Sequence, residues 1–166
     1  MHGFFSCNRK DKNPKDVKPY NGPTAVMNEV NMLFSDSAIV KVQLIAPVQN
    51  EYLNGNRTFP KGVLIYFYDN DGTLNSSLSG NQGKFDKEKN LYTVKGDVII
   101  TGIKEYKKLN TEELHWNPIT KKVFTDKFVR IETKEEILTG NGLDASQDFK
   151  QYAIRNVTGI FAVKDL

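Results

Sequence analysis

The chain has 166 residues, 39% of them hydrophobic, and a formal net charge of +3. This length and apolar content suit one domain with its own core, and the small charge, spread over mixed Lys, Asp and Glu, is against a nucleic-acid binder. No apolar run approaches the roughly 20 residues that a membrane-spanning helix needs. The single cysteine excludes an internal disulfide and a cysteine-based zinc cluster.

The first 23 residues are interpreted as the remnant of an anchor followed by a disordered tether. Residues 8–23 read NRKDKNPKDVKPYNGP, which combines many charges with three prolines and lacks apolar periodicity. This composition is typical of an extended linker rather than a packed segment. The folded domain is therefore predicted to cover residues 24–166.

The rest of the chain predicts an all-β fold with no significant helix. Seven segments are rich in β-branched and aromatic residues that alternate with polar ones: MNEVNMLF, IVKVQLIA, GVLIYFY, TLNSSLSG, NLYTVKGDVIITG, KKVFTDKFVRIET and QYAIRNVTGIFAV. Turn signals such as SDS, DNDG, DKEKN, NPITK and NGLDASQD separate them. Successive strands are therefore expected to be joined by tight turns and to lie antiparallel or in stacked layers.

A repeat of about 30 residues underlies the later strands. Three quartets share internal steps of 7, 7 and 2 residues: Leu78, Phe85, Tyr92 and Val94; Leu109, Trp116, Val123 and Thr125; Leu138, Ala145, Tyr152 and Ile154. A polar turn lies between the second and third members of each quartet. An ordinary β-sandwich also has turns every 8 to 12 residues, but three units in one register favour stacked layers of strands.

Alternation along these strands places one set of apolar side chains on a common face. This set includes Met32, Phe34, Val42, Leu44, Phe59, Val63, Ile65, Phe67, Leu78, Tyr92, Val94 and Val98. Leu64, Tyr66 and Tyr68 point to the opposite face. If the sheets close tightly, the inward set is a core; if they splay apart along one side, it lines an apolar groove. The sequence leaves both arrangements open.

Long stretches of the chain resemble the LptC family of lipopolysaccharide-export proteins, and more broadly the OstA-like domains that include LptA. The similarity covers about residues 28–161 and is carried by VQLIAPVQNEY, TFPKGVLIYFYDNDGTLNSSLSGNQGKFDKEKNLYTVKGDVIITG, KLNTEELHWNPITKKVFTDKFVRIET and LTGNGLDASQDF. The shared themes are an L-x-A or L-x-G strand, an aromatic residue before a polar turn, and a Gly-x-Val strand end. Here they are Leu44-Ile45-Ala46, Leu78-Ser79-Gly80, Phe85-Asp86 and Gly96-Asp97-Val98.

This resemblance implies a twisted, V-shaped β-jellyroll in the periplasm, attached to the inner membrane of a Gram-negative bacterium. Such a protein receives lipopolysaccharide from the inner-membrane ABC transporter and passes it to an LptA-like bridge, without a cofactor and without enzymatic activity. The twelve inward residues named above are then expected to line the path of the lipid A acyl chains, with Phe59 close to it.

The resemblance also implies which edges meet the partners, because these jellyrolls join by pairing their terminal strands. The last strand, residues 154–163 with Ile154, Val157 and Ile160, is expected to meet the LptA-like bridge. The first strand, residues 28–34, is expected to face the periplasmic domain of the transporter.

Cys7 is the predicted lipidation site. Typical LptC proteins begin with one membrane-spanning helix, which these residues lack, whereas Phe5-Ser6-Cys7 resembles the end of a bacterial lipoprotein signal. An acylated Cys7 would hold the protein at the membrane in place of the helix. The alternative is an incidental cysteine in a disordered tail.

The polar motifs give no catalytic or metal-binding prediction. Asp69-Asn70-Asp71-Gly72 has its glycine too early for an EF-hand loop and is better explained as a hairpin turn. His115 is the only histidine outside the tail, so a histidine-based metal site or a Ser-His-Asp triad would depend on it alone.

Three alternative functions stay open at this stage. One is an LptA-like soluble bridge. Another is a β-sandwich carbohydrate-binding module, which would expose aromatic residues such as Tyr66, Tyr68 and Trp116 on a flat outer face. The third is a β-stack enzyme acting on a polysaccharide, which would need carboxylates converging in a polar cleft.

Overall fold

The computed structural model describes residues 20–163, and all regular structure within them is β. Eleven strands run antiparallel and are connected into one continuous sheet. They are β1 (Ala25–Asp36), β2 (Ile39–Glu51), β3 (Arg57–Phe59), β4 (Val63–Tyr68), β5 (Leu74–Gly80), β6 (Gln82–Asp86), β7 (Leu91–Gly102), β8 (Lys107–Asn117), β9 (Lys122–Thr133), β10 (Glu136–Ser146) and β11 (Tyr152–Ala162). The prediction of an all-β fold without helix is confirmed for these residues.

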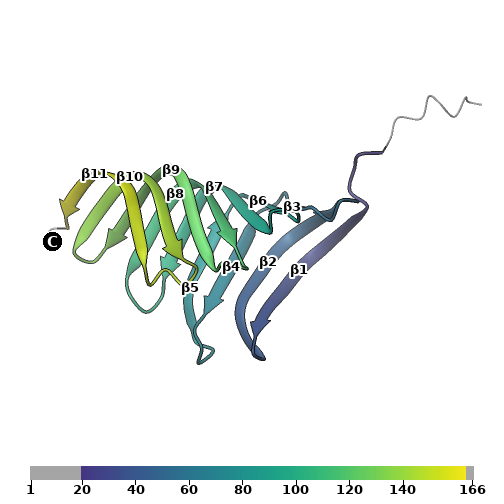
Figure 1. Cartoon of the computed structure of the whole chain (residues 1–166), viewed down its shortest axis with the longest axis horizontal. Helices are drawn as coiled ribbons and strands as arrows, with labels where there is room; N and C mark the ends of the chain where they lie inside the picture. Colours follow the sequence, from purple (N-terminus) through teal and green to yellow (C-terminus); the bar gives the residue numbers. More distant parts are fainter. Residues whose placement is uncertain (1–19, 164–166) are drawn as a thin grey trace, which may run out of the picture.

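The strands follow one another along the long axis of the molecule, from β1 at one end to β11 at the other (Figure 1). β1 pairs with β2, and the path then runs through β4, β5, β7, β8, β9 and β10 to β11. The short strands β3 and β6 connect β2 to β7 by a second route, because β2 pairs with β3, β3 with β6, and β6 with β7.

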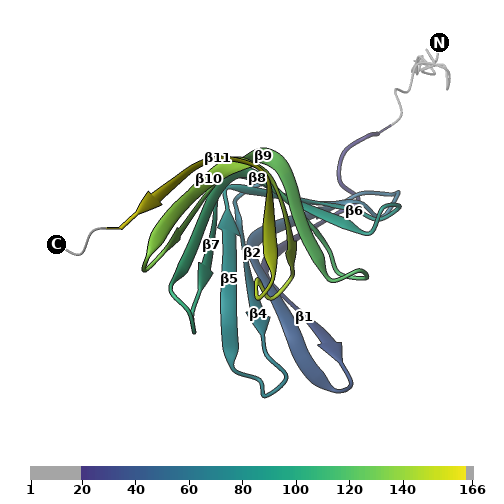
Figure 2. The same cartoon turned by 60° about the vertical axis from the view of Figure 1, so that its left-hand side comes forward.

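The long strands bend, so each contributes to both of the two halves of the sheet that lie opposite each other, which we call the two faces. The first part of β7 pairs with β6, whereas its last residues pair with β5. A register shift between Lys95 and Val98 separates the two parts, and Gly96 and Asp97 both have positive φ angles, 76° and 47°. A bulge of this kind increases the local twist, so the strands curve together over one ridge (Figure 2). The result is a twisted β-jellyroll, as the sequence predicts.

The 30-residue repeat corresponds to a hairpin in each case. Its second and third members lie directly opposite each other across the strands: Phe85 faces Tyr92, Trp116 faces Val123, and Ala145 faces Tyr152. Each repeat therefore adds one hairpin to the stack, and its apolar positions continue the same inner face. The spacing is regular because each hairpin must present the same side to its neighbours.

Two features of the fold are missing from the sequence prediction. Four of the eleven strands, β3, β6, β8 and β10, are absent from the seven predicted segments: β3 and β6 are only three and five residues long, and β8 and β10 contain few β-branched residues. The prediction of a turn at residues 141–148 is wrong, because β10 continues to Ser146. A register shift between Phe67 and Tyr68 also changes the alternation of β5, so that Asn75 and Ser76 are buried and Leu74 is only partly buried. Leu74, which shares the parity of the inward residue Leu78, is therefore less buried than that parity suggests.

Candidate functional site

The inward-facing side chains form one apolar interior that runs through the stack. Ten of the twelve predicted residues are no more than 5% exposed: Val42, Leu44, Phe59, Val63, Ile65, Phe67, Leu78, Tyr92, Val94 and Val98. Met32 and Phe34, on β1, are partly buried and pack against this core. The two faces are closed over these residues, so the arrangement is a packed interior. Contact between these side chains and a lipid stays a prediction.

An aromatic cluster joins distant strands across the interior. The indole ring of Trp116 stacks on Tyr92 with centroids 5.0 Å apart and meets Phe34 and Phe67 edge-on at 5.6 and 5.7 Å. Trp116 is 1% exposed, and its Nε1 donates a hydrogen bond to Oε1 of Gln147 at 3.2 Å. Trp116 is therefore unable to form part of an exposed sugar-binding platform, whereas Tyr66 and Tyr68, the other two aromatic residues named for a carbohydrate-binding module, are partly buried.

Arg57 brings a positive charge to the edge of this cluster and was not among the predicted site residues. Its guanidinium lies 4.9 Å from the centroid of the Phe85 ring, and Nη1 is 3.6 Å from the sulfur of Met32, 25 residues away. Burial raises the pKa of the Tyr92 phenol, while the neighbouring Arg57 charge acts in the opposite direction. The sequence carries no signal for this residue because its partners come from three other strands.

A partly enclosed cavity of about 120 Å³ lies farther along the interior. Its lining is mainly apolar and includes Ile100, Leu109, Ile131, Phe149 and Tyr152. Ser76 also lines it; this side chain is 1% exposed, and its hydroxyl has no hydrogen-bond partner among the described residues. A cavity of this size accepts an aromatic ring or a few methylene groups.

Ionic contacts connect several turns of the stack. We call the region formed by the β1–β2, β4–β5, β7–β8, β8–β9 and β10–β11 turns the mouth. Asp69, in the β4–β5 turn, pairs with Lys104 at 2.6 Å and with Lys150 at 3.1 Å. The hydrogen bond from Lys104, followed by that from Lys150, lowers the pKa of the Asp69 carboxyl, and Asp69 in turn raises the pKa of both lysines.

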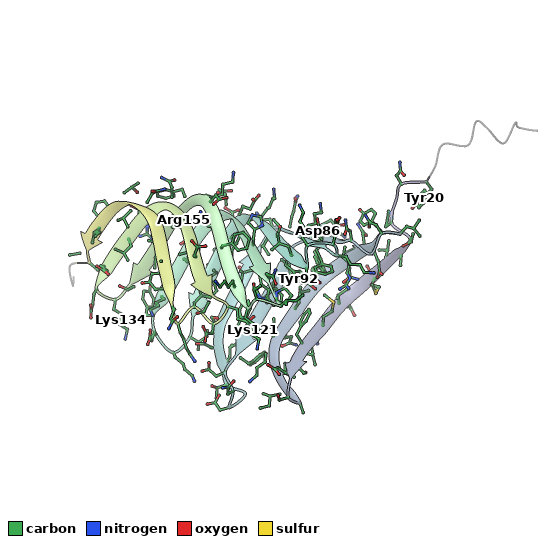
Figure 3. The ribbon with its side chains drawn as sticks, viewed as in Figure 1. Tyr20, Asp86, Tyr92, Lys121, Lys134 and Arg155 are labelled. Carbon is green, nitrogen blue, oxygen red and sulfur yellow. The ribbon has the colours of Figure 1, made fainter. Side chains whose placement is uncertain are left out.

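Two further contacts cross the mouth. Lys121 of the β8–β9 turn pairs with Asp36 of β1 at 3.0 Å, and Asn75 Nδ2 donates to the backbone oxygen of Asp148 at 2.8 Å. Lys121 and Arg155 lie on opposite sides of the stack, and Tyr92 lies inside it (Figure 3). The mouth is thus held shut by polar contacts between turns, with the aromatic cluster behind them.

Both ends of the stack present a strand that pairs on one side only within residues 20–163. β1 pairs with β2 alone, and β11 pairs with β10 alone. On β11, Ile154 is partly buried against the core, whereas Val157 and Ile160 are 54% and 66% exposed. Unpaired backbone along such an edge is able to pair with a strand of another chain.

The polar motifs have structural roles in their own turns. Asp71 accepts hydrogen bonds from the backbone N–H and the hydroxyl of Thr73, and Gly72 has a φ angle of 80°, so residues 69–73 form the predicted hairpin turn. His115 contacts the hydroxyl of Thr93 through Nδ1 at 3.0 Å and the carboxylate of Glu113 through Nε2 at 3.1 Å. Between residues 20 and 163, no three His, Cys, Asp or Glu side chains gather in a metal-binding arrangement.

Cys7, the predicted lipidation site, and most of the predicted tether lie outside the described residues. In the described part of the chain, no helix is long and apolar enough to cross a membrane.

Comparison with known proteins agrees with this architecture. No curated protein matches the chain. The model of one protein family, described as "Lipopolysaccharide-assembly, LptC-related", matches residues 3–161, which is nearly the whole sequence. The family is one of transport components of the Gram-negative envelope, and its members take part in lipopolysaccharide transport with the other proteins of the Lpt complex. The all-β jellyroll, its stacked hairpins and this match together identify the chain as a member of the LptC-related family.

Proposed function

We propose that this protein receives lipopolysaccharide from the inner-membrane ABC transporter and passes it through the interior of the jellyroll to an LptA-like bridge in the periplasm. The observation that supports this most strongly is the apolar interior, which continues from β1 to the last hairpin. Acyl chains gain about 25 cal/mol for every Å² of apolar surface that they bury. A long apolar channel is therefore the feature that a carrier of such chains needs, and no catalytic group is required.

Transport through this interior requires the two faces to separate at the mouth. The core residues are packed in the described arrangement, so acyl chains reach them only when the contacts between the turns open. Those contacts are single hydrogen bonds and ion pairs whose lysine side chains are about half exposed, and ion pairs that reach solvent in this way contribute little to stability. Separating the two faces at the mouth therefore costs less free energy than separating them along the ridge, where paired strands hold the faces together.

The two open edges are assigned to the two protein partners. β11, with Ile154, Val157 and Ile160, would add its free edge to an LptA-like strand, and β1 would face the periplasmic domain of the transporter. Main-chain pairing gives affinity, while side chains such as the exposed Val157 and Ile160 give specificity. Acylation of Cys7 would attach the chain to the inner membrane, with the residues between Cys7 and Ala25 as a spacer.

Photo-crosslinking from defined positions tests the path of the lipid. A photoreactive amino acid at Ile65 or Phe59, which point inward, is expected to trap lipopolysaccharide during active export. The same amino acid at Leu64, the neighbour of Ile65 on the other face of β4, is the matched control and is expected to trap none. Crosslinks only from Leu64 would contradict the proposed path.

Purification from membranes tests the assembly. The native protein is expected to bring lipopolysaccharide and an ABC transporter with it, and the joint absence of both would refute the export function. A Cys7→Ser variant is expected to leave the membrane fraction. If it stays there, Cys7 is not the anchor.

A further inference from the structure

We infer that the cavity beside Ser76 and the two lysines at its rim form a binding site for an acyl lipid with a phosphate headgroup. The acyl chain would enter the cavity, and the phosphate would replace the Asp69 carboxylate between Lys104 and Lys150. The choice of a lipid as ligand rests on the proposed function, but the site itself follows from its geometry.

The cavity suits the end of a hydrocarbon chain. Its walls carry Ile100, Leu109, Ile131, Phe149 and Tyr152, and its volume of about 120 Å³ accepts several methylene groups. Its lining also includes the charged residues Lys104, Lys107, Lys150, Glu105 and Asp148, which we call the rim. A pocket lined by both apolar and charged side chains is complementary to an amphiphile.

The Ser76 hydroxyl is a polar group in the cavity lining that has no hydrogen-bond partner among the described residues. Ser76 is 1% exposed, and its Oγ has no partner within residues 20–163. Buried hydroxyl groups in native proteins nearly always have a hydrogen-bond partner, because an unpaired one costs free energy. The ester or amide oxygen of an acyl group would accept a hydrogen bond from this hydroxyl.

The two lysines already converge on one anion. Oδ2 of Asp69 lies 2.6 Å from Nζ of Lys104, and Oδ1 lies 3.1 Å from Nζ of Lys150. The lysine side chains are 49% and 59% exposed, so a ligand reaches them, whereas Asp69 is only 12% exposed. A phosphate monoester offers three acceptor oxygens and a charge of about −1.5 to −2, which allows it to compete with the single negative charge of a carboxylate.

The positive and negative charges at the rim are balanced, so a phosphate must displace a carboxylate in order to bind. Lys104, Lys107 and Lys150 are matched by Asp69, Glu105 and Asp148, with Lys107 pairing with Glu105 at 2.5 Å and Lys150 lying 3.7 Å from Asp148. A phosphate therefore binds only by displacing Asp69. Because Lys150 belongs to the β10–β11 turn and Asp69 to the β4–β5 turn, this displacement also breaks one of the contacts that close the mouth.

Calorimetric titration with decyl phosphate and decyl maltoside, both below their micelle concentrations, tests the site in the whole chain. Decyl phosphate is expected to bind about tenfold more tightly, because it gains charge-assisted hydrogen bonds to two lysines. Asp69→Asn removes the competing carboxylate and is expected to tighten decyl phosphate binding further. Lys104→Gln with Lys150→Gln is expected to reduce it to the level of decyl maltoside.

Matched controls separate specific contacts from net charge. Lys61→Gln with Lys84→Gln changes the charge equally at two exposed lysines outside the cavity lining, and is expected to leave both affinities unchanged. Ser76→Leu fills the cavity and is expected to abolish binding of both amphiphiles without lowering the melting temperature. Equal affinities for the two amphiphiles, or unchanged affinity in both the Asp69 and the lysine variants, would overturn the inference.

Two sources of this lipid chemistry are distinguished by comparing lipid A with phosphatidylglycerol in mixed micelles. Tighter binding of lipid A assigns the site to lipopolysaccharide, and tighter binding of phosphatidylglycerol assigns it to membrane phospholipid. If substitution of Lys104 and Lys150 weakens the binding of neither lipid, the proposed site is refuted. The Ile65 crosslink to lipopolysaccharide reports separately on the proposed function, since Ile65 does not line this cavity.

Discussion

Phe34 of β1 meets Trp116 of β8 edge-to-face, with ring centroids 5.6 Å apart and planes at 84°. The same Phe34 ring also contacts Tyr92 at 6.1 Å. β1 forms its backbone ladder with β2, so this side-chain contact attaches the first hairpin to the middle of the stack from within. Two residues farther along β1, Asp36 pairs with Lys121 of the β8–β9 turn at 3.0 Å, so side chains attach the first hairpin to the stack at two points.

Phe34→Ala is expected to lower the free energy of unfolding by about 2 kcal/mol, because it removes a partly buried ring and two aromatic contacts. Urea denaturation followed by circular dichroism measures this change. Leu33→Ala, on the exposed face of the same strand, is the matched control and is expected to change stability by no more than about 0.5 kcal/mol. Similar effects of the two substitutions would mean that Phe34 does not hold the first hairpin in place.

Trp116 is the only tryptophan, so its fluorescence reports on the interior directly. The free protein is expected to emit at short wavelength, because the indole is 1% exposed and packed against aromatic rings. Addition of lipopolysaccharide is expected to change the intensity or wavelength of this emission if the faces separate around the cluster. An emission spectrum that stays constant at saturating lipopolysaccharide would show that lipid binds without rearranging this region.

Acid is expected to weaken the contacts of Asp69. Its pKa is lowered in the folded state by hydrogen bonds from Lys104 and then Lys150, so this carboxylate adds stability above its ordinary pKa of 3.8. That contribution is lost as the pH falls through the lower folded-state value. Unfolding free energies of the wild type and Asp69→Asn, measured between pH 7 and pH 2, are expected to differ most at neutral pH and to converge in acid. A difference that is independent of pH would contradict this account.

Arg155 is expected to hold β11 onto the stack. Its Nη2 donates to the backbone oxygen of Thr125 at 2.5 Å and pairs with Asp126 at 2.7 Å, while Nε pairs with Asp144 at 3.2 Å. Arg155→Ala removes links from β11 to both β9 and β10. Amide hydrogen exchange in residues 152–162 is expected to accelerate, with a small effect on global stability, because edge strands open locally before the whole fold does.

Arg130→Ala serves as the control for that experiment. Arg130 pairs with Glu132 of its own strand, so its removal cuts no link to β11. Exchange in residues 152–162 is expected to stay at the wild-type rate in this variant. If the proposed partner edge is correct, Arg155→Ala also weakens binding to an LptA-like strand, whereas Arg130→Ala does not.

Much of the fold was accessible from local patterns. The 7-7-2 spacing predicted hairpins whose second and third members, such as Trp116 and Val123, lie opposite each other. The predicted inward residues face the core because side chains alternate strictly along a strand. The prediction lost accuracy where this alternation is interrupted: the bulge in β5 also buries Asn75, which lies on the outward parity, and neither the repeat nor the hydropathy pattern contains a signal for it.

The residues at the mouth had no local signal at all. Asp69 was interpreted only as part of a turn, because its partner Lys150 is 81 residues away, and Asp36 and Lys121 are 85 residues apart. An Asp or Lys in a turn looks like any other solvated charge until the chain brings its partner close. Arg57 was missed for the same reason.

The sequence by itself determined the all-β class, seven of the strands, the repeated hairpins and the apolar face, since these depend on periodicity within a few residues and on turn chemistry. Only the tertiary structure decided that the apolar face is packed shut, that Trp116 lies inside it, and that a cavity with an unpaired Ser76 hydroxyl opens beside Lys104 and Lys150. These properties depend on how far the two faces curve toward each other. That curvature is set by the bulges of many strands acting together, so no single segment encodes it.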